Sequence, residues 1–124
     1  MKTNKKTLVF GASLKSNRYS NIATKRLLDH KIETEAFGLK AGEIKGCEIK
    51  TNLHDFRNIH TITLYIGAAR QPEYYDAFLQ IAPKRVIFNP GTENPELYKI
   101  LKNNGIEVEV ACTLVLLSTN QYYL

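Results

Sequence analysis

The alternation of short apolar runs with segments of helical periodicity is the feature that most constrains the fold. Runs such as Thr7–Phe10 show no apolar–polar alternation, so they predict strands that are buried on both faces of a parallel sheet. The five expected strands are 7–10, 33–37, 61–66, 85–88 and 106–110. Strands that alternate with helices predict βαβ units and a doubly wound domain.

Three helices are expected between these strands, each with its own start or stop signal. The first spans about Ser20–His30, with Ser20 as the expected N-cap. The second spans about Gln71–Ala82, with a proline in its first turn. The third begins after the expected cap Asn94 and ends at Gly105.

Two further segments carry weaker signals. Residues 38–58 form the least regular part of the chain, where we expect loops, a short strand near 47–49 and a helical turn near 53–56. The apolar segment 112–117 predicts a short helix that packs at the sheet edge. The predicted fold is therefore an α/β, three-layer, Rossmann-like doubly wound domain with a mostly parallel five-stranded sheet, and residues 1–124 form a single domain.

Charge and hydropathy exclude several function classes. The net charge is +5, but no basic run extends beyond Lys5-Lys6, which argues against nucleic acid as the partner and fits a smaller anionic ligand. No apolar run approaches the roughly 18 residues of a membrane span, and the apolar segment after the basic N-terminus is too short for a signal peptide. We therefore expect a cytoplasmic protein, in which Cys47 and Cys112 stay reduced.

The loop after the first expected strand contains everything that an anion requires. Gly11 permits a tight turn, and the helix that follows offers unpaired N–H groups and the positive end of its dipole. Hydroxyl donors and cations accompany this turn. The candidate ligand residues here are Gly11, Ala12, Ser13, Lys15, Arg18 and Ser20. The same local signals also fit a plain turn, a helix cap and solvated cations.

Two other loops fall at the same edge of the expected sheet, where such sheets bind ligands. Asn89, Pro90 and Gly91 again place a glycine turn ahead of a helix start, and Gly67 belongs to a small basic loop after the third strand. We expect the amides at the two helix starts to converge on one diphosphate, and the coenzyme assignment made from the sequence depends on that convergence. Taken alone, each loop also fits an ordinary turn.

Known nucleotide and catalytic motifs are missing. A dinucleotide fingerprint would need glycine at Ser13 and Ser16, and the chain has no G-K-[ST] phosphate loop. No paired carboxylates, metal spacing or serine elbow emerges, and His54-Asp55 fits a surface turn. Cys112 is expected to be a packed side chain, although a reactive thiol at the crevice stays open. No catalytic residue is therefore assigned.

The chain resembles the small stand-alone CoA-binding proteins, whose fold is similar to the N-terminal domain of the succinyl-CoA synthetase α subunit. The resemblance covers about residues 7–117. It rests on the order and spacing of four segments, which are Val9-Phe10-Gly11-Ala12-Ser13, Arg18-Tyr19-Ser20, Asn89-Pro90-Gly91, and Gly105-Ile106-Glu107-Val108 leading to Cys112.

The resemblance implies coenzyme A, or an acyl-CoA, as the bound cofactor, with its pyrophosphate at the Gly-Ala-Ser turn and the first helix start. It also implies that Lys40 lies near the nucleotide part and that Gly67 lines the site. Where the family often reads Val-Asn-Pro-Lys, this chain reads Phe37-Gly38-Leu39-Lys40. The synthetase's phosphorylated histidine lies in a further domain, so the resemblance implies a ligand and no reaction.

Two other readings stay open on the sequence. One is an enzyme that uses another nucleotide such as NAD(P). The other is a degenerate Rossmann scaffold for protein interaction, with Tyr122-Tyr123 as an exposed end or a subunit contact of a homodimer.

Overall fold

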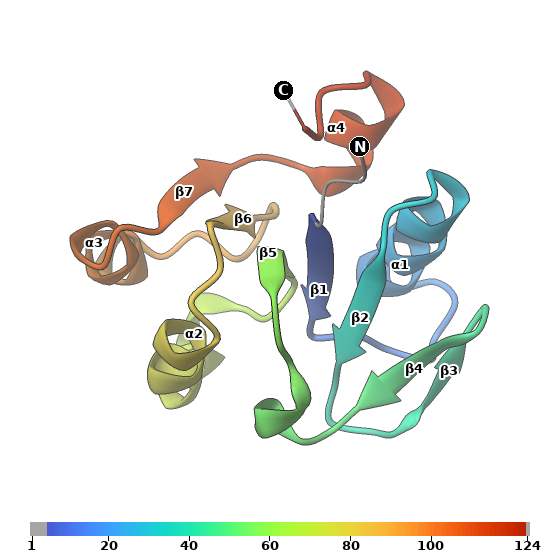
Figure 1. Cartoon of the computed structure of the whole chain (residues 1–124), viewed down its shortest axis with the longest axis horizontal. Helices are drawn as coiled ribbons and strands as arrows, with labels where there is room; N and C mark the ends of the chain where they lie inside the picture. Colours follow the sequence, from blue (N-terminus) through green and yellow to red (C-terminus); the bar gives the residue numbers. More distant parts are fainter. Residues whose placement is uncertain (1–4, 124) are drawn as a thin grey trace.

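The structure, a computed structural model, describes residues 5–123 and contains one mixed sheet covered by helices on both faces (Figure 1). The strands are β1 (Lys6–Phe10), β2 (Thr34–Phe37), β3 (Gly42–Ile44), β4 (Cys47–Lys50), β5 (Ile59–Leu64), β6 (Arg85–Phe88) and β7 (Glu107–Val110). The α-helices are α1 (Tyr19–Asp29), α2 (Tyr75–Ile81), α3 (Pro95–Asn103) and α4 (Thr113–Ser118). Short 3₁₀ turns occupy Leu53–Asp55, Ala68–Arg70 and Pro72–Tyr74.

The strand order β3-β4-β2-β1-β5-β6-β7 confirms the doubly wound architecture. β1 pairs in parallel with β2 on one side and with β5 on the other. From β1 the chain passes through α1 to β2, and it later returns to build outward from β5. The strand order therefore reverses between β1 and β5, the place where open α/β sheets bind ligands.

The sheet has seven strands among residues 5–123, so the expectation of five was wrong. The difference lies in the irregular segment, where β3 and β4 form an antiparallel hairpin and β4 pairs in parallel with β2. The hairpin turns at Lys45 and Gly46, both with positive φ (47° and 85°). Two-residue hairpin turns require that conformation, and Lys-Gly signals it less clearly than Asn-Gly.

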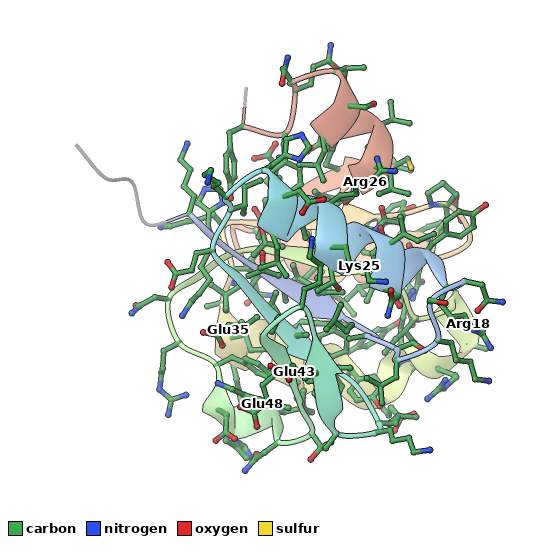
Figure 2. The ribbon with its side chains drawn as sticks, turned by 90° about the vertical axis from the view of Figure 1, so that its right-hand side faces the viewer. Arg18, Lys25, Arg26, Glu35, Glu43 and Glu48 are labelled. Atoms are coloured by element: carbon green, nitrogen blue, oxygen red, sulfur yellow. The ribbon has the colours of Figure 1, made fainter. Side chains whose placement is uncertain are left out.

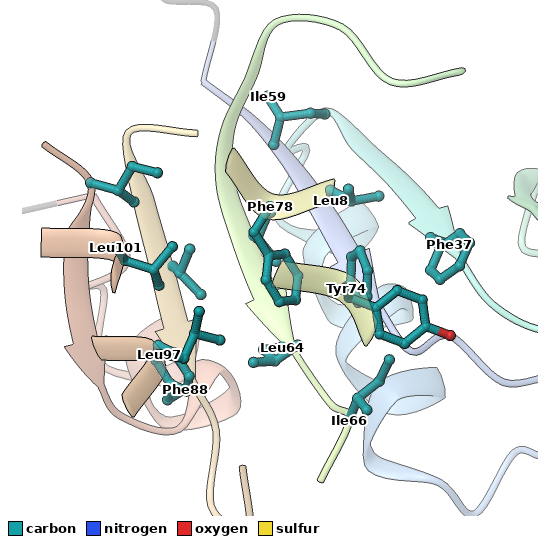
Figure 3. Close-up of a cluster of buried hydrophobic side chains, with 14 of the residues drawn as sticks. Leu8, Phe37, Ile59, Leu64, Ile66, Tyr74, Phe78, Phe88, Leu97 and Leu101 are labelled. Carbon is teal, nitrogen blue, oxygen red and sulfur yellow. The ribbon is translucent and has the colours of Figure 1, made fainter. Parts of the chain in front are cut away.

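Two apolar layers lie against the sheet. On one face, α2 and α3 bury Phe78, Leu97 and Leu101 against Leu8 and Leu64 of the sheet (Figure 3). On the other face, α1 and α4 cover a second cluster, with Leu27 and Leu116 among its buried members. Burial on both faces explains why the central strands are continuous apolar runs.

The helix starts differ in part from expectation. The first helix begins at Tyr19 with Arg18 as its N-cap, so the prediction of Ser20 as the cap was wrong. The second expected helix begins as a 3₁₀ turn at Pro72–Tyr74 before it becomes α2. The third is confirmed, since the Asn94 side chain accepts a hydrogen bond from the Leu97 N–H and Pro95 occupies the first turn.

The C-terminal tyrosines do not form an exposed end, which corrects that reading. Tyr122 is buried, and its hydroxyl lies 2.8 Å from the Thr7 Oγ1 at the start of β1. Tyr123 is half-buried and donates a hydrogen bond to the Lys5 carbonyl. The last described residues are therefore part of the fold. Within residues 5–123, every helix is too short or too polar to cross a bilayer.

Candidate functional site

The turn after β1 lies at the point where the strand order reverses. Gly11 has φ +102°, and its N–H and that of Ala12 both donate to the Phe37 carbonyl, at 2.9 and 2.8 Å. A Cβ on Gly11 would lie 3.0 Å from Ile66 Cγ1 and 3.2 Å from the Tyr65 carbonyl carbon. Backbone conformation and lack of space thus both require glycine, and the loops after β1, β2 and β5 meet here.

The loop between β1 and α1, residues 11–18, is called the first loop here, and hydrogen bonds at Ser13 fix its conformation. The Ser13 Oγ accepts a hydrogen bond from the Lys15 N–H, and the Ser13 carbonyl accepts one from the side-chain amide of Asn21 at 2.8 Å. Asn21 is buried in the first turn of α1 and was not among the predicted site residues. Within residues 5–123, the N–H groups of Ser13, Leu14, Ser16 and Asn17 make no hydrogen bond.

Two cations, Lys15 and Arg18, lie in the same segment as these unpaired amides, and Lys40 lies in the loop after β2. Lys15, Arg18 and Lys40 are exposed, and none of them forms an ion pair with another residue in the range 5–123. Figure 2 shows Arg18 at the first-loop end of α1, with Lys25 and Arg26 further along the helix. The carbonyl of Arg18 accepts the Asn21 and Ile22 N–H groups, and its side chain makes no capping bond. The guanidinium is therefore free to bind an anion.

Ser20 does not share this exposure. Ser20 is buried within α1, and its carbonyl accepts a hydrogen bond from the Thr24 hydroxyl at 2.7 Å. A ligand contact at Ser20 is thus limited to its backbone N–H at the helix start.

The loop after β2 approaches the first loop closely. A Cβ on Gly38 would lie 2.5 Å from the Ala12 carbonyl oxygen and 3.0 Å from Ile49 Cγ2. An asparagine at this position, as the resemblance expects, would have to push the two loops apart. Glycine is therefore a consequence of how tightly they pack here. Lys40 follows in an exposed bend of the same loop.

The loop after β6 is held by hydrogen bonds to β5 and α4 and by one within the loop. Asn89 is buried, its side-chain amide donates to the Thr63 Oγ1 and the Leu64 carbonyl, and its Oδ1 accepts the Thr113 N–H. Pro90 and Gly91 are exposed, but the Gly91 N–H donates to the Glu93 carboxylate at 2.9 Å. The Glu93 carboxylate already accepts the Gly91 N–H, and its negative charge disfavours a phosphate at this loop.

Gln71 joins the loops after β5 and β6, and the sequence analysis did not single it out. Its fully buried amide donates to the Ile66 and Thr92 carbonyls, both at 2.8 Å. Asn94 in turn donates to the Gln71 Oε1. Gly67 lies exposed between these bonds with open space around its Cα. No local sequence signal marks this link, because the burial of Gln71 arises from packing against Thr92, 21 residues further along the chain.

The two helix starts do not converge on one point, which corrects the expected geometry. α1 and α3 both begin at the carboxyl edge of the sheet, but they cover opposite faces, and β5 lies between β1 and β6 (Figure 1). Within the described chain, unpaired N–H groups also occur after β5, at Gly67 and Ala68, but those of the first loop lie in the same segment as the unpaired cations Lys15 and Arg18. An anion site on the first loop and the start of α1 would therefore not need the start of α3.

The cysteines and the tyrosine beside Gly11 are the groups to consider for chemical reactivity. Cys112 is half-buried at the start of α4, and Cys47 is buried, where desolvation raises the pKa of its thiol. Burial raises the pKa of Tyr65, beside Gly11, to about 12, so its phenol stays protonated at neutral pH. No cluster of metal-binding side chains occurs in the part of the chain that the structure describes.

A doubly wound sheet with a glycine turn at its reversal point defines the class of Rossmann-like α/β domains. Within that class, the model of one family, the CoA binding domain, matches residues 5–118. The chain therefore belongs to the CoA binding domain family. Curated proteins gave no match.

Solved structures share the fold. An uncharacterized protein is 45% identical, with a TM-score of 0.92 over 98% of this chain and 100% of its own. A Thermus thermophilus protein, cell-free ID.343, is 21% identical, with a TM-score of 0.83 over 95% of this chain and 90% of its own. A dinucleotide-forming acetyl-coenzyme A synthetase 1 from Ca. Korarchaeum cryptofilum, solved with phosphate and ADP, is 17% identical, with a TM-score of 0.69 over 84% of this chain and 25% of its own.

Proposed function

We propose that the chain binds coenzyme A or an acyl-CoA, with the diphosphate on the first loop. The observation that carries the proposal is the set of unpaired N–H groups between Ser13 and Asn17, beside the unpaired cations Lys15 and Arg18. Backbone N–H groups at a helix start bind phosphate oxygens, and arginine adds two parallel hydrogen bonds. Membership of the family supports the same ligand.

The surrounding loops have distinct roles in this proposal. Lys40 faces the nucleotide part of the coenzyme, while Gly11 and Ala12 let it approach the backbone closely. Asn89, Pro90, Gly91 and Gly67 shape the wall of the crevice. We assign no catalytic residue, and the protein would sense, store or present the coenzyme in the cytoplasm, where its two free cysteines stay reduced.

Thermal unfolding of the full chain with CoA tests the proposal. At about 100 times the dissociation constant, CoA should stabilise the fold by about 2.7 kcal/mol. Millimolar CoA that leaves Tm unchanged would refute the assignment. A shift with NAD(P) and none with CoA would favour a different nucleotide. Mass spectrometry of any small molecule released on denaturation gives a second readout.

Arg18→Ala tests the first loop directly. Loss of a charge-assisted contact to the diphosphate should weaken CoA binding roughly tenfold. Arg26→Ala is the matched control, because Arg26 is an exposed arginine of the same helix in its last turn. Equal affinities of the two variants would remove Arg18 from the site.

A further inference from the structure

A cavity of about 330 Å³ lies at the amino-terminal edge of the sheet, away from the candidate CoA site. β1, β5, β6 and β7 are parallel and begin at this edge, and the last described residues fold over it. Its charged, polar and aromatic lining includes Lys5, His60, Arg85, Glu107, Glu109 and Tyr123. Nothing in the proposed CoA function uses this cavity.

Arg85 carries an unsatisfied donor in this lining. Its side chain is only 8% exposed, and its Nη1 donates to the Glu109 carboxylate at 3.0 Å and to the Tyr122 carbonyl at 2.7 Å. The Nε donates to the Thr61 Oγ1 at 3.2 Å. The Nη2 is buried and has no hydrogen-bond partner among residues 5–123. Buried guanidinium N–H groups are normally paired, so this one calls for an acceptor.

Unpaired charges of both signs share the cavity. Lys5 and Glu107 line it, and neither forms an ion pair with another residue of the described chain. The Lys5 Nζ lies 5.1 Å from the centre of the Tyr123 ring, and the guanidinium carbon of Arg85 lies 5.8 Å from the same ring. A simple anion would meet two carboxylates here, and a simple cation would meet Arg85 and Lys5.

We propose that this cavity binds a small zwitterion of the α-amino acid class. The ligand carboxylate accepts hydrogen bonds from Arg85 Nη2 and Lys5, and its ammonium group faces Glu107. Because Nη2 is buried, side chains around Arg85 have to move before the carboxylate can reach it. The proposal stands apart from CoA binding, since the two sites occupy opposite edges of the sheet.

Two-dimensional NMR of the ¹⁵N-labelled full chain, titrated with each common L-amino acid to millimolar concentration, tests the proposal. At least one amino acid should give saturable shifts at His60, Gln121 and the Arg85 Nε–H signal, with Gly11 unmoved. The same side chain without its ammonium group, or without its carboxylate, should bind at least tenfold more weakly. If no amino acid shifts the cavity signals, or if the one-charge analogues bind equally well, the proposal is wrong.

Two variants test whether the amino acid binds in this cavity, and both leave the buried Arg85 and its structural hydrogen bonds unchanged. Lys5→Gln and Glu107→Gln should each weaken the amino acid about tenfold, whereas Lys99→Gln and Glu43→Gln, which are exposed and outside the cavity, should not. Retained affinity in both cavity variants would overturn the assignment. CoA affinity, measured in parallel, reports on the other site and separates the two proposals.

Discussion

Two glycines of the candidate site differ in the room around their Cα atoms. A Cβ on Gly38 would lie 2.5 Å from a backbone oxygen, whereas a Cβ on Gly67 would meet nothing within 4 Å. We expect Gly38→Ala to lower the free energy of unfolding by about 2–3 kcal/mol, because the backbone has to shift. Gly67→Ala should be neutral or stabilising by up to about 1 kcal/mol. Urea unfolding measures both.

The Gly38 substitution also reports on function. Moving the loop after β2 displaces Ala12, so CoA affinity should fall in Gly38→Ala and stay unchanged in Gly67→Ala. Equal stabilities of the two variants would contradict the close packing of the loops after β1 and β2.

His60 makes stability depend on pH. Burial, followed by the charges of Arg85 and Lys5, lowers the pKa of His60 below its ordinary value of 6.5. The unfolded chain therefore binds this proton more readily than the folded one. The contribution of His60 to stability is fully present above pH 6.5 and is lost as the pH falls toward the folded pKa.

Urea unfolding of His60→Asn across pH 5–8 checks this expectation. The variant should lose part of the decline in stability on the acid side of about pH 6.5. His54→Asn provides the control, because His54 is exposed in a surface turn. An unchanged pH profile in His60→Asn would argue that the imidazole is protonated equally in both states.

Single residues of the first loop could be predicted because their chemistry is local. A glycine that ends a buried strand and precedes a helix indicates a tight turn, and Gly11 has the positive φ that such a turn requires. The requirement for glycine at position 38 could not be predicted this way. It arises because a Cβ there would clash with the carbonyl oxygen of Ala12, which is remote in sequence. Ser20 was misassigned as a cap because Arg18 caps the helix through its backbone alone.

At the scale of elements, Asn89 ties β6 to its neighbours. Its side chain bonds β5 through Thr63 and Leu64 and bonds the start of α4 through the Thr113 N–H. Asn89→Ala would leave several buried polar groups unpaired, so we expect a loss of about 2–4 kcal/mol in the free energy of unfolding. Denaturant unfolding measures it.

Asn103→Ala serves as the control for this prediction, since Asn103 is exposed near the end of α3. It should change stability by less than about 0.5 kcal/mol. A loss at Asn89 as small as that of the control would show that water replaces its bonds. In that case Asn89 would remain available to a ligand.

The strands and helices that alternate along the chain could be predicted, and so could the short strand near 47–49, the helical turn near 53–56 and the short helix over 112–117. The five expected strands and the third helix were recognisable from apolar runs, caps and stop signals, although the edge strand β7 contains no buried residue. β3 and its pairing with β4 could not be predicted, because β3 is three residues long and the turn between the two strands uses lysine at positive φ. The position of the α1 start relative to the α3 start could not be predicted either, because it depends on which face of the sheet each helix covers.

Across the whole molecule, Tyr122 joins the two ends of the described chain. Its ring is buried, its hydroxyl pairs with Thr7, and its carbonyl accepts from Arg85. Tyr122→Ala should lower the free energy of unfolding by about 3–4 kcal/mol, because a large buried side chain and its hydrogen bond are both lost. Differential scanning calorimetry measures the fall in Tm.

Tyr19→Ala is the comparison, because Tyr19 is 71% exposed at the start of α1. It should change Tm by only one or two degrees, corresponding to about 0.5 kcal/mol or less. If the two tyrosine variants melt alike, the C-terminal segment contributes nothing to the cooperative unit.

The contact between Tyr123 and the Lys5 carbonyl has a consequence for the connectivity of the fold. Since the two ends of the described chain meet there, a short linker could join them, and new termini could be opened at the exposed Lys45–Gly46 turn. Such a circular permutant would keep every strand neighbour and leave the loops of the proposed CoA site unbroken. The permutant would therefore change the order in which the strands are synthesised while their order in the sheet stays the same.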